Sequence, residues 1–139
     1  MTKEELVVAV KAIVALAKEM KIDDMYVGYT SLFQKPDFTT LRPEDQRQAL
    51  KLMVLFKGAP KKPFTPAMLK ACEAAIGPLT ELVSVHNEPG DFEMLGICHL
   101  ALGREEAASN MYRAGLTIER ERNPGSDLCG TLMRRVSEL

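Results

Sequence analysis

Apolar residues recur every three or four positions through most of this chain, which is the spacing of helices that bury one face. The pattern is clear at the start, where Leu6, Val10 and Ile13 fall on one side of a helix. Thr2 stands just before this stretch, with a glutamate three residues later, which is the arrangement of a helix N-terminal cap. The pattern therefore predicts an amphipathic helix over residues 3–20.

The same spacing, interrupted by proline and glycine, predicts further helices along the chain. They are expected from residue 23 or 24 to 33, 43 to 56, 66 to 85, 92 to the turn at Gly103, 104 to 122, and 126 to the C-terminus. Thr65, Asp91 and Ser126 are expected to act as N-terminal caps. Gly77-Pro78 should end or kink the helix that starts at residue 66. No stretch alternates apolar and polar residues between turn signals, as a half-buried strand would. The predicted fold class is therefore all-α, with about seven or eight helices.

The segment from Lys57 to Pro63 is the clearest break in the pattern, because a glycine and two prolines interrupt it and three lysines keep it solvated. We interpret it as a linker between two helical halves, residues 1–58 and 64–139. At 139 residues the chain matches the size of a single domain. The sequence therefore predicts one all-helical domain over residues 1–139.

Composition narrows the classes of function. Apolar residues make up 46% and charged residues 27%, and the formal net charge is −1, which gives no general attraction to nucleic acid or to anionic lipid. No long apolar run suggests a targeting or membrane-spanning segment. Three widely spaced cysteines suit reduced thiols. We therefore expect a cytoplasmic protein with no membrane or nucleic-acid partner.

Residues 92–116 form the most informative segment, because small and aromatic residues alternate there as two packed antiparallel helices require. Gly96 and Ala108 remove side-chain bulk where the helices are expected to cross, so that the backbones can approach. Phe92 and Tyr112 are expected to fill the wider spaces on either side. Gly103 lies where the chain must reverse, and glycine tolerates the positive φ that is common there.

This spacing closely resembles the tetratricopeptide repeat family. With Gly96 as the family's conserved glycine, the remaining family positions are matched by Phe92, Leu95, Gly103, Ala108, Tyr112 and Leu116. The match departs where His99 replaces an aromatic, where Gly115 replaces an alanine, and where Pro124 comes about four residues late. The resemblance covers about a quarter of the chain, residues 89–122.

A weaker echo lies at residues 24–33, where Val27-Gly28 parallels Leu95-Gly96. Ala49, Met53 and Phe56 would then provide the second helix, after a turn about nine residues too long. The resemblance implies one clear repeat and one degenerate repeat. Stacked helical hairpins would form a short α-solenoid with the first and last helices as caps.

The family binds partners in a groove lined by the first helix of each repeat, which implies a partner-binding surface in this chain. Its positions are Glu93, Ile97 and Leu100 in the clear repeat and Met25, Tyr29 and Leu32 in the degenerate one. The alternative is that these residues simply form the core. The resemblance thus implies a non-enzymatic module that binds a peptide or helix of another protein, as an adaptor or chaperone.

Two other classes of function remain open. A homodimer is the second possibility, in which the helical faces are covered by another copy of the chain and the protein has a structural or assembly role. An enzyme with an unrecognised site is the third possibility, with Cys98 and His99 as its best candidates. These two adjacent side chains point about 100° apart on a helix, so they cannot hold one ion by themselves. No cofactor or metal site is predicted.

Overall fold

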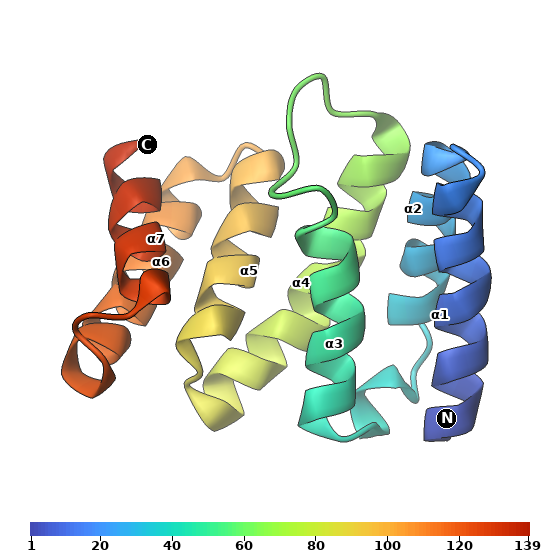
Figure 1. Ribbon diagram of the computed structural model, residues 1–139, viewed down its shortest axis with the longest axis horizontal. Helices are drawn as coiled ribbons and strands as arrows, with labels where there is room; N and C mark the ends of the chain where they lie inside the picture. The colour runs from blue at the N-terminus through green and yellow to red at the C-terminus, as the bar shows by residue number, and fades with distance from the viewer. The chain divides into compact units, whose positions relative to one another are not determined.

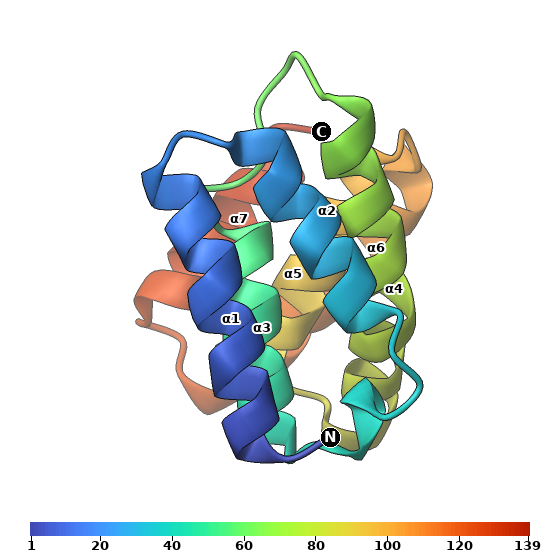
Figure 2. The same ribbon diagram turned by 90° about the vertical axis from the view of Figure 1, so that its right-hand side faces the viewer.

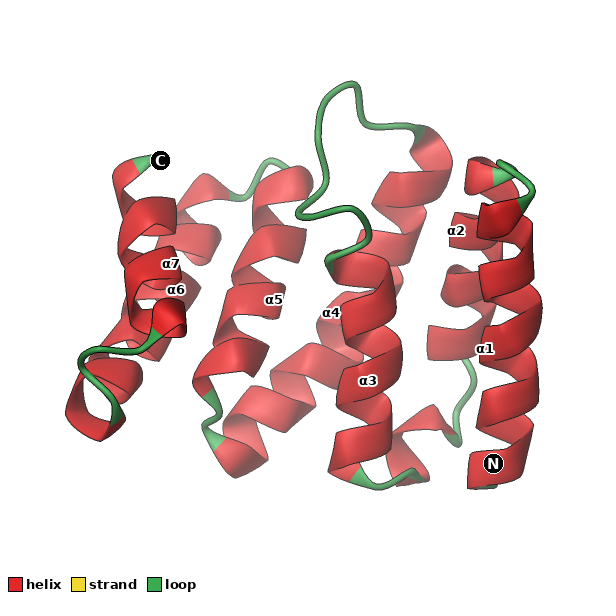
Figure 3. Cartoon of the chain, in the orientation of Figure 1, coloured by secondary structure: helices red, strands yellow, loops and turns green.

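The computed structural model describes residues 1–139 and contains helices, turns and loops but no strand (Figure 1, Figure 3). The predicted all-α class is therefore confirmed. The seven α-helices and one short 3₁₀ helix are α1 (Lys3–Lys18), α2 (Ile22–Phe33), η1 (Phe38–Thr40), α3 (Pro43–Val54), α4 (Pro66–His86), α5 (Pro89–Ala101), α6 (Glu105–Arg122) and α7 (Asp127–Ser137).

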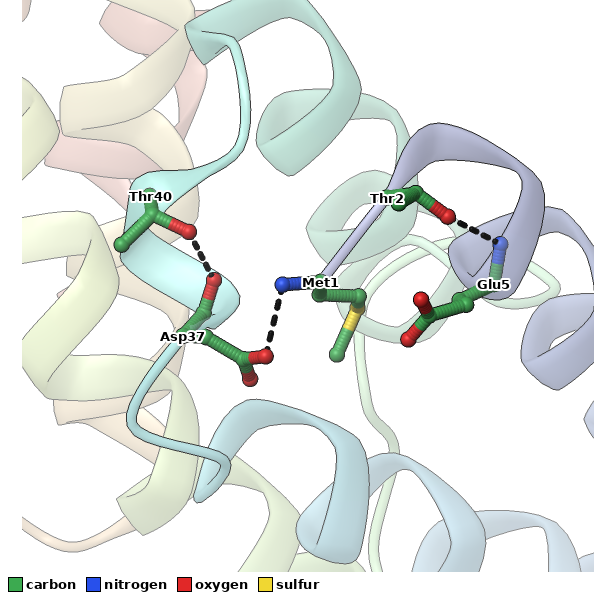
Figure 4. Close-up of polar contacts among 5 residues, drawn as sticks. All are labelled: Met1, Thr2, Glu5, Asp37 and Thr40. Carbon is green, nitrogen blue, oxygen red and sulfur yellow. Dashed lines mark hydrogen bonds and ion pairs between the residues drawn. The ribbon is translucent and has the colours of Figure 1, made fainter.

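Three predicted N-terminal caps are present. The Thr2 hydroxyl accepts a hydrogen bond from the Glu5 amide at 3.1 Å (Figure 4). Thr65 accepts one from the Met68 amide at 3.2 Å, and Ser126 accepts one from the Cys129 amide at 3.0 Å. Each bond satisfies an amide that has no partner within the first helical turn, which is why these helices begin where the sequence indicates.

Several boundaries differ from the prediction by one to three residues, and two of them have a clear local cause. α1 ends at Lys18 instead of residue 20, because Met20 adopts the left-handed conformation, with φ of 63°, and reverses the chain. α5 begins at Pro89, so Asp91 lies in its first turn and is not the predicted cap. Proline suits this first position because its missing N–H would have no helical partner there.

The chain divides into two compact units, residues 1–78 and 79–139. The boundary lies within α4, at Pro78, whereas the predicted halves meet at the segment 57–63. α4 continues through Gly77-Pro78, so the proline does not end the helix. Proline has no amide to donate, so the hydrogen-bond ladder of α4 has a gap at that point.

In the first unit, α1 and α2 pack together as an antiparallel pair, and α3 runs in the same direction as α1 (Figure 1, Figure 2). The pair approaches closely at Gly28, where an added Cβ would lie 2.8 Å from Cγ1 of Ile13. Gly28 thus faces the helix before it in the chain. In the second unit Gly96 faces the helix after it. The two glycines that the repeat comparison aligned, Gly28 and Gly96, therefore contact different kinds of neighbour.

Aromatic packing and one buried amide complete the first unit. The rings of Tyr29 and Phe33 stack with centroids 5.8 Å apart, and Phe38 lies 5.2 Å from Phe33. Gln46, only 5% exposed, donates from Nε2 to the carbonyl of Leu41 at 2.8 Å. This bond ties the start of α3 to the loop that precedes it, because a buried amide requires a partner.

In the second unit, α5 and α6 form the predicted helical hairpin, and α7 packs against α6. The close contacts alternate between the two helices. Gly96 of α5 lies against the ring of Tyr112, because an added Cβ would come 2.6 Å from its Cδ1 atom. Gly115 of α6 lies against the start of α5, because an added Cβ would come 2.9 Å from Cβ of Phe92 and 3.2 Å from the carbonyl oxygen of Pro89. The nearest neighbour of Gly96 is therefore Tyr112, a residue that was expected in a wider space to one side of the crossing. Each helix provides one glycine at a close approach to the other helix.

Candidate protein-binding groove

An apolar groove runs between α1 and α3 in the first unit. Its cavity has a volume of about 300 Å³. The lining residues are Lys3, Leu6, Val7, Val10 and Lys11 from α1, and Asp45, Gln48, Ala49 and Leu52 from α3. Helical spacing explains this, because residues three and four positions apart share one side of each helix.

The floor and the walls of the groove differ in exposure. Leu6 is 6% exposed and Ala49 is 2% exposed, so both belong to the core beneath the groove. Val7 and Leu52 are 40% and 36% exposed, and their side chains therefore offer apolar surface to solvent from opposite helices. Small side chains such as Ala49 leave the space between the two helices unfilled.

The groove continues along α3 beyond its C-terminal end. A second hollow, of about 360 Å³, shares Gln48 and Leu52 with the first one. Its other lining residues are Lys51, Leu55, Phe56 and Lys57. The Lys57 ammonium group lies 5.5 Å from the centroid of the Phe56 ring, within the range of a cation–π contact. We refer to these two neighbouring hollows, which share two lining residues, together as the α1–α3 groove.

Positive charge surrounds the α1–α3 groove. Four lysines line it, namely Lys3, Lys11, Lys51 and Lys57. Its one acidic residue, Asp45, is largely covered and lies 3.9 Å from the Lys3 ammonium nitrogen. The lining therefore carries a formal charge of about +3, although the whole chain carries −1. The local excess favours a negatively charged occupant.

A wider hollow lies on the other side of α1, beside the loop between α2 and η1. It has a volume of about 770 Å³ and is lined by Met1, Glu4, Glu5, Val8, Ala9, Lys35, Pro36 and Asp37. The Met1 amino group donates a hydrogen bond to Asp37 Oδ2 at 2.6 Å (Figure 4). This hydrogen bond lowers the pKa of the Asp37 carboxyl group below its ordinary value. Both members of this polar pair belong to the lining of the hollow.

The six residues that the repeat resemblance suggested for partner binding are placed differently. The buried ones are Met25, Tyr29, Leu32, Glu93 and Ile97, each 7% exposed or less. Leu100, at 41%, is the only one with substantial exposure. Their burial agrees with the alternative interpretation, in which such residues belong to the core. The structure does not bring the six together as one open surface.

Glu93 has an internal partner. Its Oε2 atom accepts a hydrogen bond from Arg135 Nε at 2.7 Å, and the two side chains are 9% and 15% exposed. Tyr112 lies close enough for its ionisation to depend on both groups. Burial raises the pKa of Tyr112 to about 12, while Arg135 lowers it and Glu93 raises it. The three residues connect α5, α6 and α7, which is a structural role for Glu93.

The candidate catalytic pair is also placed within the second unit. Cys98 is completely buried, so its thiol does not reach solvent, while His99 is half-buried. No three side chains among histidine, cysteine, aspartate and glutamate converge in a way that would hold a metal ion. None of the seven helices has both the length and the apolar character required to cross a bilayer.

Comparison with known proteins adds no assignment: no family model, curated protein or solved structure matches this chain. The resemblance to tetratricopeptide repeats therefore depends on the residues quoted above. The α1–α3 groove was not predicted from the sequence. One signal pointed to it, because Val7 and Val8 follow Leu6 directly, so α1 carries apolar residues outside its buried face.

Proposed function

We propose that this chain is a non-enzymatic protein-interaction module that binds a segment of another protein in the α1–α3 groove. The observation that carries the proposal is the pair Val7 and Leu52, apolar side chains on facing helices that remain exposed above a covered floor. Burial of such side chains by a partner contributes about 25 cal/mol for each Å² of apolar surface removed from water.

The proposal retains the class of function that the repeat resemblance implies but moves its site. Sequence reasoning placed the partner on α2 and α5, at residues that are mostly buried. A partner segment that required those residues would first have to displace core packing, whereas the α1–α3 groove is open in the folded chain. A role as adaptor or chaperone for a partner's segment is compatible with this surface.

A photo-crosslinking amino acid placed at position 52 tests the proposal in cells that express the full chain. We expect a discrete crosslinked protein, whose contact can be mapped to one peptide by mass spectrometry. The matched control carries the same amino acid at Lys70, which is exposed on α4 and lies outside the groove. Equal crosslinking from both positions would show that the groove has no preferred partner.

Self-association is the second candidate, and the exposure of Val8 favours it. Val8 is 70% exposed and lies two residues from the buried Leu6, so it projects from a different side of α1. A second copy of the chain that covered this side would remove it from water. Light scattering over a range of concentrations distinguishes the two candidates, because a dimer that resists dilution supports self-association and a monomer does not.

A further inference from the structure

We infer that the segment received by the α1–α3 groove is acidic, with apolar side chains for the groove and carboxylates for its rim. This inference rests on the proposed function and adds the chemical class of the partner. It depends on the charges that surround the groove and not on the groove's existence alone.

The distribution of charge carries the first step. Lys11, Lys51 and Lys57 are exposed and have no ion-pair partner among the other residues that line the groove. Lys3 has one, Asp45, at 3.9 Å, and its own side chain is 63% exposed. An incoming basic segment would meet these ammonium groups without neutralising them. An incoming acidic segment would form ion pairs with them, which favours the correct partner and speeds its encounter.

The apolar lining provides the second step of the argument, because an occupant that carries only negative charge would not match it. Leu52 lines both hollows, and Val7 and Val10 line the first of them from α1. A segment with carboxylates alone would cover these side chains with groups that need water. A segment with apolar residues at helical or alternating spacing covers the groove's apolar side chains and removes them from water, while its own carboxylates stay at the rim. The groove therefore selects for both kinds of residue in one partner.

The shape of the site favours a protein segment over a membrane surface, which also combines negative charge with apolar groups. Val7 and Leu52 project toward a hollow of about 300 Å³ from facing helices. The flat surface of a bilayer would not reach the floor of such a hollow. Asp45 would also face the anionic headgroups, whereas a peptide amide can donate a hydrogen bond to it.

Synthetic peptides provide the probe. Three labelled peptides of about 15 residues, about four helical turns, share the same apolar positions and carry glutamate, glutamine or lysine elsewhere. Binding to the full chain is measured by fluorescence anisotropy. An exposed ion pair contributes about a twofold change in affinity, so four lysines predict roughly tenfold tighter binding of the glutamate peptide than of the glutamine peptide. This preference should shrink as ionic strength rises to about 0.15 M and above.

Two sets of variants separate the inference from the proposed function. Lys11→Glu combined with Lys51→Glu should abolish or reverse the preference for the glutamate peptide, and the control Lys18→Glu, outside the groove, should not. Leu52→Glu or Val7→Glu should weaken binding of all three peptides. Circular dichroism shows which variants stay folded. If only one of Leu52→Glu and Val7→Glu stays folded, that variant alone is enough for the test.

The outcomes are distinct. Equal binding of the glutamate and glutamine peptides, still sensitive to Leu52→Glu, would overturn the acidic preference and leave the proposed function intact. No binding of any peptide would overturn both. Binding of the chain to vesicles of anionic phospholipid, lost in the double lysine variant and absent with neutral vesicles, would replace the acidic segment with a membrane surface.

Discussion

The contact between Gly96 and Tyr112 leads to a prediction that separates helix propensity from packing. Alanine favours a helix over glycine by about 1 kcal/mol, so Gly96→Ala would stabilise α5 if propensity alone mattered. The added Cβ, however, would lie 2.6 Å from Cδ1 and 3.1 Å from Cζ of the Tyr112 ring. The first distance is about 1 Å shorter than a normal contact between carbon atoms.

Tyr112 has little room to move away, because it is only 1% exposed. Forcing an extra carbon into such a site costs about 1–3 kcal/mol, and the extent of the overlap favours the upper part of this range. After the gain in propensity is subtracted, we expect Gly96→Ala to lower the free energy of unfolding by about 1–2 kcal/mol. Urea denaturation followed by far-UV circular dichroism measures this change.

Gly130 provides the matched control within the same unit. It lies inside α7, and an added Cβ there would meet no heavy atom within 4 Å. Gly130→Ala should therefore raise the free energy of unfolding by about 1 kcal/mol. Introducing Tyr112→Leu should reduce the cost of Gly96→Ala, with a coupling energy of at least about 1 kcal/mol. If Gly96→Ala is as stabilising as Gly130→Ala, the packing argument for the hairpin is wrong.

Three further predictions concern single sites. Met20→Gly should raise the free energy of unfolding by about 1 kcal/mol in urea denaturation, because Met20 has φ of 63°, which penalises a side chain; an unchanged stability would show that the turn is not strained. Burial raises the pKa of all three tyrosines, that of Tyr112 to about 12. The folded state thus holds these phenol protons more tightly than the unfolded chain does, and the stability linked to Tyr112 is complete below about pH 10 and is lost as the pH rises toward 12; ultraviolet titration at pH 10 should show less tyrosinate in the native chain than in the urea-unfolded chain, and equal ionisation of the two would contradict this. Arg135→Met should cost about 2–3 kcal/mol by leaving the Glu93 carboxylate covered without its cation, and Arg135→Met with Glu93→Met should recover most of that loss; no recovery would argue against the ion pair as the cause.

The helices could be predicted from the sequence because their signals are local. Periodicity, the cap hydroxyls of Thr2 and Ser126, and the turn at Gly103 each depend on residues within one or two helical turns. The helix boundaries that were predicted wrongly depend on backbone conformations that the apolar pattern does not reveal, such as the left-handed Met20 after the end of α1. Pro78 was expected to end or kink α4, and the first of these outcomes is wrong, because the helix continues through the proline.

The packing partners could not be predicted in the same way. The sequence identified Gly96 as a site of close approach but did not identify Tyr112, one helical turn after Ala108 on α6, as its nearest neighbour. Glu93 was expected to face a partner, yet its cation is Arg135, forty-two residues later in the chain. The α1–α3 groove depends on two helices that are not consecutive, so no single stretch of sequence encodes it.

The contact between Gly96 of α5 and Tyr112 of α6 has a consequence for how this protein evolves. Position 96 accepts a side chain only when the ring at position 112 is lost or displaced. Neither residue is free to mutate first without loss of stability. Among divergent descendants of this gene, positions 96 and 112 should therefore change together, whereas position 115 should remain glycine, because an added Cβ there would meet the Phe92 Cβ and the Pro89 carbonyl, which a change of the ring at position 92 does not remove.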